Sequence, residues 1–163
     1  MLREQFRKLE EKLLGGIKAF YDERLISVVL FGSVGRDTPN FYSDVDILII
    51  AKDLPQGRIP RIREFEKIEE QIAPFLDSLR REGIQTEISA ILKSPNEAEQ
   101  GSPLFLDMVE DGRILFDRDG FFSALLRQLS NRLRILGARR IWRGDAWHWV
   151  LKPDFKPGEV FEI

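Results

Sequence analysis

The chain has 163 residues, of which 43% are hydrophobic and 32% charged; this is typical of one folded domain and excludes a disordered or fibrous chain. It contains no cysteine, which excludes a disulfide scaffold, a thiolate metal site and a cysteine nucleophile, and its one histidine, His148, argues against a multi-histidine metal site. The formal net charge of −2 gives no signature of nucleic-acid binding, and a metal ion here would be held mainly by oxygen ligands.

The first part of the chain has the periodicity of one helix followed by two buried strands. Apolar residues recur every three or four positions over Leu2–Phe20, which predicts an amphipathic helix. Ile26–Phe31 is a short, almost wholly apolar run and predicts a strand that is buried on both faces. Gly32 and Ser33 then interrupt the pattern, and Asp44–Ala51 is a second apolar strand that begins with two acids.

The rest of the chain alternates helices, strands and turn signals. A predicted helix over Pro60–Arg81 contains Pro74, which should kink it. Arg139–Ile163 carries all three tryptophans and is predicted to form a hairpin or an irregular cap. The other predicted elements are a strand over Ile84–Leu92, a helix from Ser102-Pro103 to Gly112, a strand over Arg113–Asp117, and a helix over Phe121–Leu136 that Gly137 ends.

This order of elements predicts an α/β (α+β) fold, in which helices flank a small mixed sheet and a C-terminal helix leads into a Trp-rich tail. We expect residues 1–120 to form the main domain and residues 121–163 to pack on it. No apolar run reaches the ~18 residues that a bilayer crossing needs, so we expect no membrane contact and a cytoplasmic protein.

The C-terminal region has two features with alternative interpretations. Six arginines and no acid lie between Arg127 and Arg143, and they form either a solvated helix face or an anion-binding surface. The tryptophans, Trp142, Trp147 and Trp149, either bury themselves against the domain or stack on a nucleic-acid base.

Asp44 and Asp46 are the first candidate functional pair. Successive side chains of a strand alternate between faces, so these two carboxylates project from the same face, ~6.6 Å apart along the backbone. Two like charges at the start of a buried strand repel each other and lose solvation. A divalent cation between them would remove both penalties, so we expect a magnesium-type site here.

The second candidate lies where the first strand ends. Gly32 allows the backbone to approach a ligand closely, and Ser33 supplies a hydroxyl where a short helix can begin. Free amides at such a helix start favour a phosphate group, and Arg36, about one turn further on, can add a charge-assisted contact. The chain has neither a Walker lysine motif nor a GxGxxG fingerprint.

Glu87 is the third candidate, on the predicted strand Ile84–Leu92. If that strand pairs beside Asp44–Ala51, Glu87 can join the two aspartates as a ligand or act as the base for an attacking hydroxyl. The alternative is a surface acid without a role in chemistry. Asp107 and Glu110 are the other candidates for a third acid.

These residues resemble a known family. Gly32-Ser33, ten further residues and Asp44-Val45-Asp46 match the GSx10DxD signature of minimal nucleotidyltransferases in the DNA polymerase β superfamily. The resemblance includes Arg36 and Ser43 and extends from about residue 26 to residue 92. Asp37 stands where the family often has glycine, and the third acid is a glutamate where aspartate is commoner.

The resemblance implies a two-metal transfer of a nucleoside monophosphate, AMP from ATP in our expectation, to a hydroxyl acceptor. Asp44, Asp46 and Glu87 would be the catalytic residues and the ligands of Mg²⁺ or Mn²⁺, with the nucleotide and its phosphates bound by Gly32, Ser33, Arg36 and Ser43. The alternative is a non-catalytic nucleotide-binding antitoxin or interaction module that pairs with a HEPN-type partner. A HEPN-type protein, an RNA acceptor and a second copy of the chain are the macromolecular partners left open.

Arg143 and His148 also match the short R-x4-H ribonuclease motif of HEPN proteins. That motif belongs to an all-helical bundle, whereas this one lies in a tail that contains tryptophan and proline. We therefore interpret His148 as a packed or capping side chain and not as a catalytic one.

Overall fold

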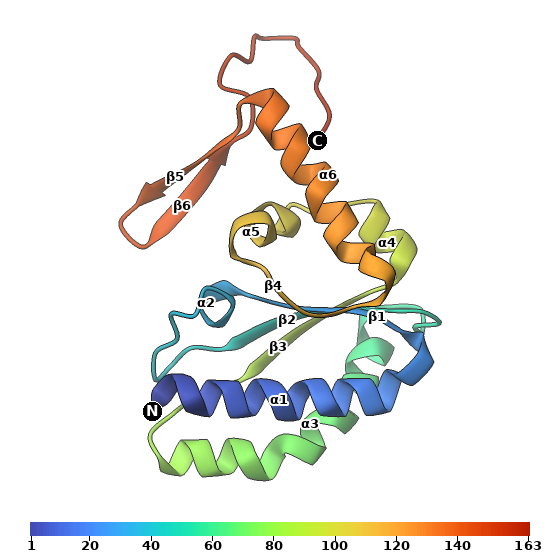
Figure 1. The fold of residues 1–163 in the computed structure, drawn as a ribbon, viewed down its shortest axis with the longest axis vertical. Coiled ribbons are helices and arrows are strands. Elements are labelled where there is room, and N and C mark those ends of the chain that lie inside the picture. Colours follow the sequence, from blue (N-terminus) through green and yellow to red (C-terminus); the bar gives the residue numbers. More distant parts are fainter.

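A four-stranded mixed sheet forms the centre of the molecule, and a separate two-stranded hairpin projects near its C-terminal end (Figure 1). The computed structural model describes residues 1–163. The strand order is β3-β2-β1-β4; β1 runs antiparallel to β2 and β4, and β2 runs parallel to β3. The sheet strands are β1 (Leu25–Phe31), β2 (Val45–Ala51), β3 (Ile88–Lys93) and β4 (Arg113–Asp117), and the hairpin consists of β5 (Arg139–Arg143) and β6 (Ala146–Val150).

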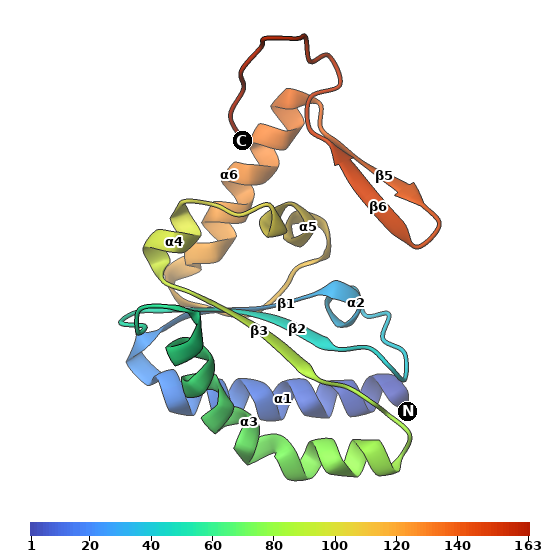
Figure 2. The same cartoon turned by 180° about the vertical axis from the view of Figure 1, so that it is seen from behind.

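Helices cover both faces of this sheet, as an α/β fold requires (Figures 1 and 2). Two lie on one face, α1 (Leu2–Tyr21) and α3 (Arg58–Arg81), and α3 contains Pro74 and changes direction along its length (Figure 2). The other face carries α4 (Pro95–Glu99), α5 (Leu104–Asp111) and α6 (Phe121–Leu136), while the four-residue α2 (Gly32–Gly35) follows β1 directly. None of the helices has the length and apolar character that a membrane crossing requires.

The central strand β2 is apolar because it is covered on both sides. Val45, Ile47 and Ile49 belong to a core shared with α1 and α3, whereas Leu48 and Ile50 belong to a second core with α5 and α6. The expectation of a small mixed sheet flanked by helices is therefore confirmed.

Several element bounds differ from the sequence expectation, most of them by one or two residues. The strand expected over Ile84–Leu92 begins only at Ile88, because the amide of Ile84 bonds to Leu79 O at the end of α3 and the amide of Gln85 bonds to Phe41 O. Asp44 precedes β2 by one residue. The short helix α4 was not expected, although Ser94-Pro95-Asn96-Glu97 is an N-terminal helix signal and Ser94 Oγ accepts the amide of Glu97 at 3.2 Å.

Asp117 joins the sheet to the C-terminal helix. Its carboxylate accepts hydrogen bonds from the hydroxyls of Ser27 and Ser123 and from the amides of Phe122 and Ser123, all at 2.7–2.9 Å. Burial alone would raise the pKa of Asp117, but these hydrogen bonds outweigh it and hold the pKa below its ordinary value. Phe122 is fully buried in the second core, so α6 packs directly on the sheet.

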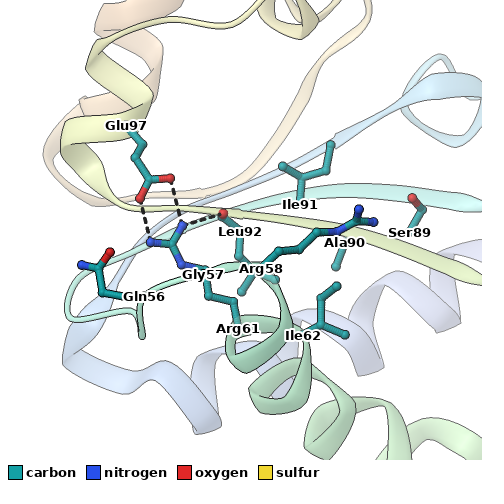
Figure 3. Close-up of a pocket in the computed structure, with 10 residues that line it drawn as sticks. All are labelled: Gln56, Gly57, Arg58, Arg61, Ile62, Ser89, Ala90, Ile91, Leu92 and Glu97. Carbon is teal, nitrogen blue, oxygen red and sulfur yellow. Dashed lines mark hydrogen bonds and ion pairs between the residues drawn. The ribbon is translucent and has the colours of Figure 1, made fainter.

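The ion pair between Arg61 and Glu97 gives a testable prediction about stability. Two Arg61–Glu97 hydrogen bonds, at 2.7 and 2.9 Å, join α3 to α4, and Arg61 lowers the pKa of Glu97 from 4.5 to about 2 (Figure 3). A carboxylate with a lowered folded-state pKa stabilises the fold above its unfolded pKa, and this contribution disappears as the pH falls toward 2. Glu97→Gln should therefore lower the free energy of unfolding at pH 7, by an amount that shrinks below pH 4.5.

Urea unfolding of Glu97→Gln and of the natural chain between pH 2 and pH 7 measures this difference. Glu99→Gln, at an exposed position on the same helix, is the control and should stay close to the natural chain throughout. A deficit for Glu97→Gln that does not change with pH would rule out the ion pair as its cause.

Candidate functional site

The turn after β1 brings the backbone close to the acids of β2. Gly32 has φ +67°, and Phe31 before it pairs with Asp46 across the β1–β2 ladder. A methyl group at Gly32 would have its Cβ 3.2 Å from the carboxylate carbon of Asp46 and closer still to Oδ2. Only glycine fits this position, because it alone tolerates both the left-handed backbone and the contact.

Backbone hydrogen bonds within the turn stabilise α2 and the loop that follows it. The amide of Arg36 bonds to Gly32 O at 3.0 Å and that of Thr38 to Ser33 O at 2.8 Å. Asp37 has φ +58°, the left-handed conformation that favours glycine, which aspartate tolerates better than most residues. The departure from glycine at this position thus leaves the turn intact.

Asp46 and Asp44 lie near each other but in different surroundings. Asp46 is half-buried in β2, and burial first, then the charge of Asp44, raises its pKa, while Arg36 opposes the shift. Asp44 is exposed, and its Oδ1 accepts the amide of Glu87 at 3.1 Å. Neither aspartate forms an ion pair with an arginine or lysine. A desolvated carboxylate beside a second one, neither of them in an ion pair, fits a hard divalent cation such as Mg²⁺.

Glu87 lies beside Asp44 and not in a closed cluster with both aspartates. It is exposed, and its carbonyl accepts the amide of Val45 at 2.8 Å at the start of the β2–β3 ladder. Glu87, Asp44 and Glu69 line one hollow of about 350 Å³ between β3 and α3. No group of three acidic or histidine side chains is close enough together to form a metal site. A role of Glu87 as ligand or base therefore stays a prediction.

Ser43 has a clear local contact. It is buried, its Oγ accepts the amide of Asn40 at 2.8 Å, and its own amide donates to Asn40 O at 3.2 Å. These bonds shape the loop that leads into Asp44. A contact between Ser43 and a nucleotide stays a prediction, as do the phosphate contacts of Gly32, Ser33 and Arg36.

The C-terminal hairpin reaches the site through Arg36, a connection that the sequence did not predict. Asp111 of α5 contacts Arg36 at 3.7 Å and Arg140 of β5 at 2.6 Å. The Arg36 guanidinium also lies 4.9 Å from the centre of the Trp147 ring. No spacing signal in the sequence relates these four residues, because they come from four elements, the end of α2, α5, β5 and β6, that meet only in the folded chain.

Asp107 anchors the same hairpin from α5. Its Oδ1 accepts the indole N–H groups of Trp147 at 2.6 Å and of Trp149 at 2.9 Å, so this carboxylate is engaged by the tail. Trp147 and Trp149 are thus half-buried against the domain, whereas Trp142 is 48% exposed.

Replacing Asp107 by alanine tests this anchor. The two indole donors would lose their acceptor, so we expect a loss of about 2 kcal/mol in stability and a red shift of tryptophan emission as water reaches the rings. Asp145→Ala, in the exposed hairpin turn, is the control and should change neither quantity. Unchanged emission in Asp107→Ala would show that other contacts hold the hairpin.

The amino-acid sequence of the chain is similar to those of known proteins. A family model described as "Nucleotidyltransferase domain" matches residues 10–105. A protein of Methanocaldococcus jannaschii named "Putative protein adenylyltransferase MJ1305" is 36% identical over 131 residues, which are 74% of this chain and 84% of the relative.

Solved structures give a more distant likeness. The crystal structure of a toxin-antitoxin with AMP-PNP has a TM-score of 0.43 and 17% identity over 78% of this chain and 95% of that chain. A mutant of the toxin-antitoxin MntA-HpeT has a TM-score of 0.44 and 19% identity over 78% and 94%.

Proposed function

Because the chain belongs to the nucleotidyltransferase domain family, as a minimal nucleotidyltransferase of the polymerase β superfamily, we propose that it transfers AMP from ATP to a hydroxyl group of another molecule. The observation that carries this proposal is the contact between Gly32 and the half-buried Asp46, with Asp44 close by. It puts the backbone of the Gly32 turn directly against one of two neighbouring carboxylates, neither of which forms an ion pair.

In this proposal each part of the site has a separate task. The turn at Gly32 and Ser33 binds the β and γ phosphates, and Arg36 orients them by its charge. Asp44 and Asp46 would hold Mg²⁺ or Mn²⁺, which when bound neutralises phosphate charge and polarises the reacting oxygens. The acceptor oxygen forms a bond to the α phosphorus, the bond to the bridging oxygen breaks, pyrophosphate leaves, and Glu87 accepts the acceptor's proton.

A specific observation also favours a second function, that of a nucleotide-binding antitoxin or interaction module with a HEPN-type partner. Ile141 and Trp142 on the hairpin are 40% and 48% exposed, and a protein partner could bury both side chains, tryptophan being a residue type enriched at interfaces. This module would keep the nucleotide site without turnover.

Label transfer separates the two functions. The protein is incubated with ATP, GTP, CTP or UTP labelled at the α phosphate, with Mg²⁺ or Mn²⁺, and with protein and RNA acceptors. Transfer of label from ATP, abolished in Asp44→Asn and Asp46→Asn, supports the enzyme. Tight ATP binding without transfer to any acceptor supports the module.

We also propose that residues 1–120 are the nucleotidyltransferase domain and that residues 121–163 are a C-terminal addition packed on it. In support, Phe122 is fully buried against α5, and Arg140, Trp147 and Trp149 are tied to acids of α5. The addition is thus attached at both its helix and its hairpin.

A further inference from the structure

β3 is an edge strand, and its outer side bears backbone groups that no other strand uses. Its only neighbour in the sheet is β2. The carbonyl of Glu87 faces β2, since it accepts the amide of Val45. Because alternate residues of a strand direct their backbone groups to opposite sides, Ile88, Ala90 and Leu92 direct theirs outward. The carbonyl of Leu92 accordingly accepts Arg61 Nη1 from outside the sheet at 3.3 Å.

A groove follows this outer edge. One hollow of about 750 Å³ lies between β3 residues 89–92 and the start of α3, with Arg58 and Ile62 on its α3 side (Figure 3). The smaller hollow that contains Asp44 and Glu87 shares four lining residues with it: Arg58, Ile62, Ser89 and Ala90. The two hollows therefore share walls on β3 and α3, and together they extend from Glu97 of α4 to Asp44 and Glu87, whereas Asp46 lines neither of them.

The charges in the groove favour an extended polypeptide over RNA. Glu69 and Glu87 line the end of the groove beside Asp44, and these two carboxylates, to which the proposed function gives no metal ion, would repel a phosphate backbone. Arg61 is already paired with Glu97, whereas Arg58 is exposed and has no carboxylate partner. Ile62, Ala90 and Ile91 add apolar lining. An edge strand binds a peptide strand through its outward amides and carbonyls and through pockets for alternate side chains, and here Arg58 adds one unpaired positive charge.

We propose that a polypeptide acceptor binds by docking one of its segments on β3 as an additional strand. An acidic side chain of this segment pairs with Arg58, and a hydroxyl side chain reaches the hollow beside Asp44. This inference rests on the proposed function: the segment's hydroxyl oxygen bonds to the α phosphorus of ATP, pyrophosphate leaves, and the proton passes to Glu87.

Hydrogen exchange of the full chain tests docking without depending on turnover. The probe is an eight-residue peptide of alternating valine and threonine that carries one glutamate and one tyrosine; its control is the same peptide N-methylated at alternate residues. We expect the first peptide to slow exchange of the Ile88 and Ala90 amides at least fivefold, while the Ser89 and Ile91 amides change little. Absence of this protection at saturating peptide, equal protection by the N-methylated peptide, or protection by a single-stranded RNA oligomer instead, would overturn the proposal.

Two variants test the consequence for transfer. Ala90→Pro removes one outward N–H, a change that edge strands tolerate, and Ala90→Ser keeps it as the matched control. Arg58→Glu reverses the unpaired charge. We expect Ala90→Pro and Arg58→Glu to reduce label transfer to the peptide at least tenfold, with ATP affinity unchanged and Ala90→Ser at the natural rate. Natural-rate transfer in both variants would overturn docking on β3 and leave the enzyme intact, whereas no transfer by the natural chain, despite protection at β3, would overturn the proposed function alone.

Discussion

Asp46→Asn should reduce AMP transfer by roughly 1000-fold or more, which corresponds to about 4 kcal/mol of transition-state stabilisation. Asparagine preserves the shape of the side chain but removes the charge that would bind a divalent cation, and such an ion contributes several kcal/mol to the stabilisation of phosphate charge. The same change should not lower the stability of the fold. Burial and the neighbouring Asp44 raise the pKa of Asp46, so its ionised form is disfavoured in the folded protein.

The sign of the stability effect makes this prediction specific. A group with a raised folded-state pKa costs stability when it is ionised, so at pH 7 Asp46→Asn should unfold at the same temperature as the natural chain or at a higher one. Thermal unfolding with and without Mg²⁺, together with transfer of α-labelled AMP, provides both measurements. The natural chain should gain stability from Mg²⁺ and ATP, and Asp46→Asn should gain less.

Asp77→Asn is the matched control for this prediction. Asp77 lies on the exposed side of α3 and forms only an i,i+3 contact with Arg80, so its replacement should leave transfer and its Mg²⁺ dependence unchanged. Transfer by Asp46→Asn at more than a tenth of the natural rate would contradict the assignment of this carboxylate to the site.

The sequence predicted best those elements whose local signals were strong. Arg113–Asp117 and Phe121–Leu136 are observed with the predicted bounds. The strand is a short apolar run that begins after Gly112, and the helix has a clear helical periodicity that Gly137 ends. The start of β3 was predicted four residues too early, because Ile84 and Thr86 are buried as strand residues are. These residues instead belong to the segment that connects α3 to β3, whose backbone amides bond to the end of α3 and to Phe41. Alternation alone does not distinguish such a buried connection from a strand.

The candidate site was predictable only where its residues are neighbours in sequence. The turn after β1 and the pairing of β1 with β2 bring Gly32 next to Asp46, so the spacing of Gly32, Asp44 and Asp46 along the chain was enough to predict that they lie together. Arg36 is different: its neighbours Asp111 and Trp147 lie some 75 and 111 residues further along the chain and meet it through tertiary packing. The position of Glu87 relative to Asp44 depended on the register of β3, and the pairing of β3 with β2 determines that register.

Gly32→Ala should reduce transfer by at least 100-fold, the second-largest effect that we expect, and it should also destabilise the fold. Two penalties act at this residue. An L-residue at φ +67° costs roughly 1–2 kcal/mol. In addition, the new methyl group would overlap the Asp46 carboxylate, with 3.2 Å between Cβ and the carboxylate carbon, so Asp46 must turn away or the turn must open.

Gly120→Ala separates these penalties, because Gly120 has the same φ of +67° but no atom within 4 Å of an added Cβ. It should therefore show the loss of stability from backbone strain and keep full transfer. Urea unfolding gives the first quantity and label transfer the second. If Gly32→Ala loses no more activity than Gly120→Ala, the close approach of the turn to Asp46 has no part in the reaction; if only Gly32→Ala is inactive at a comparable stability, the position of that carboxylate against the backbone is what the reaction requires.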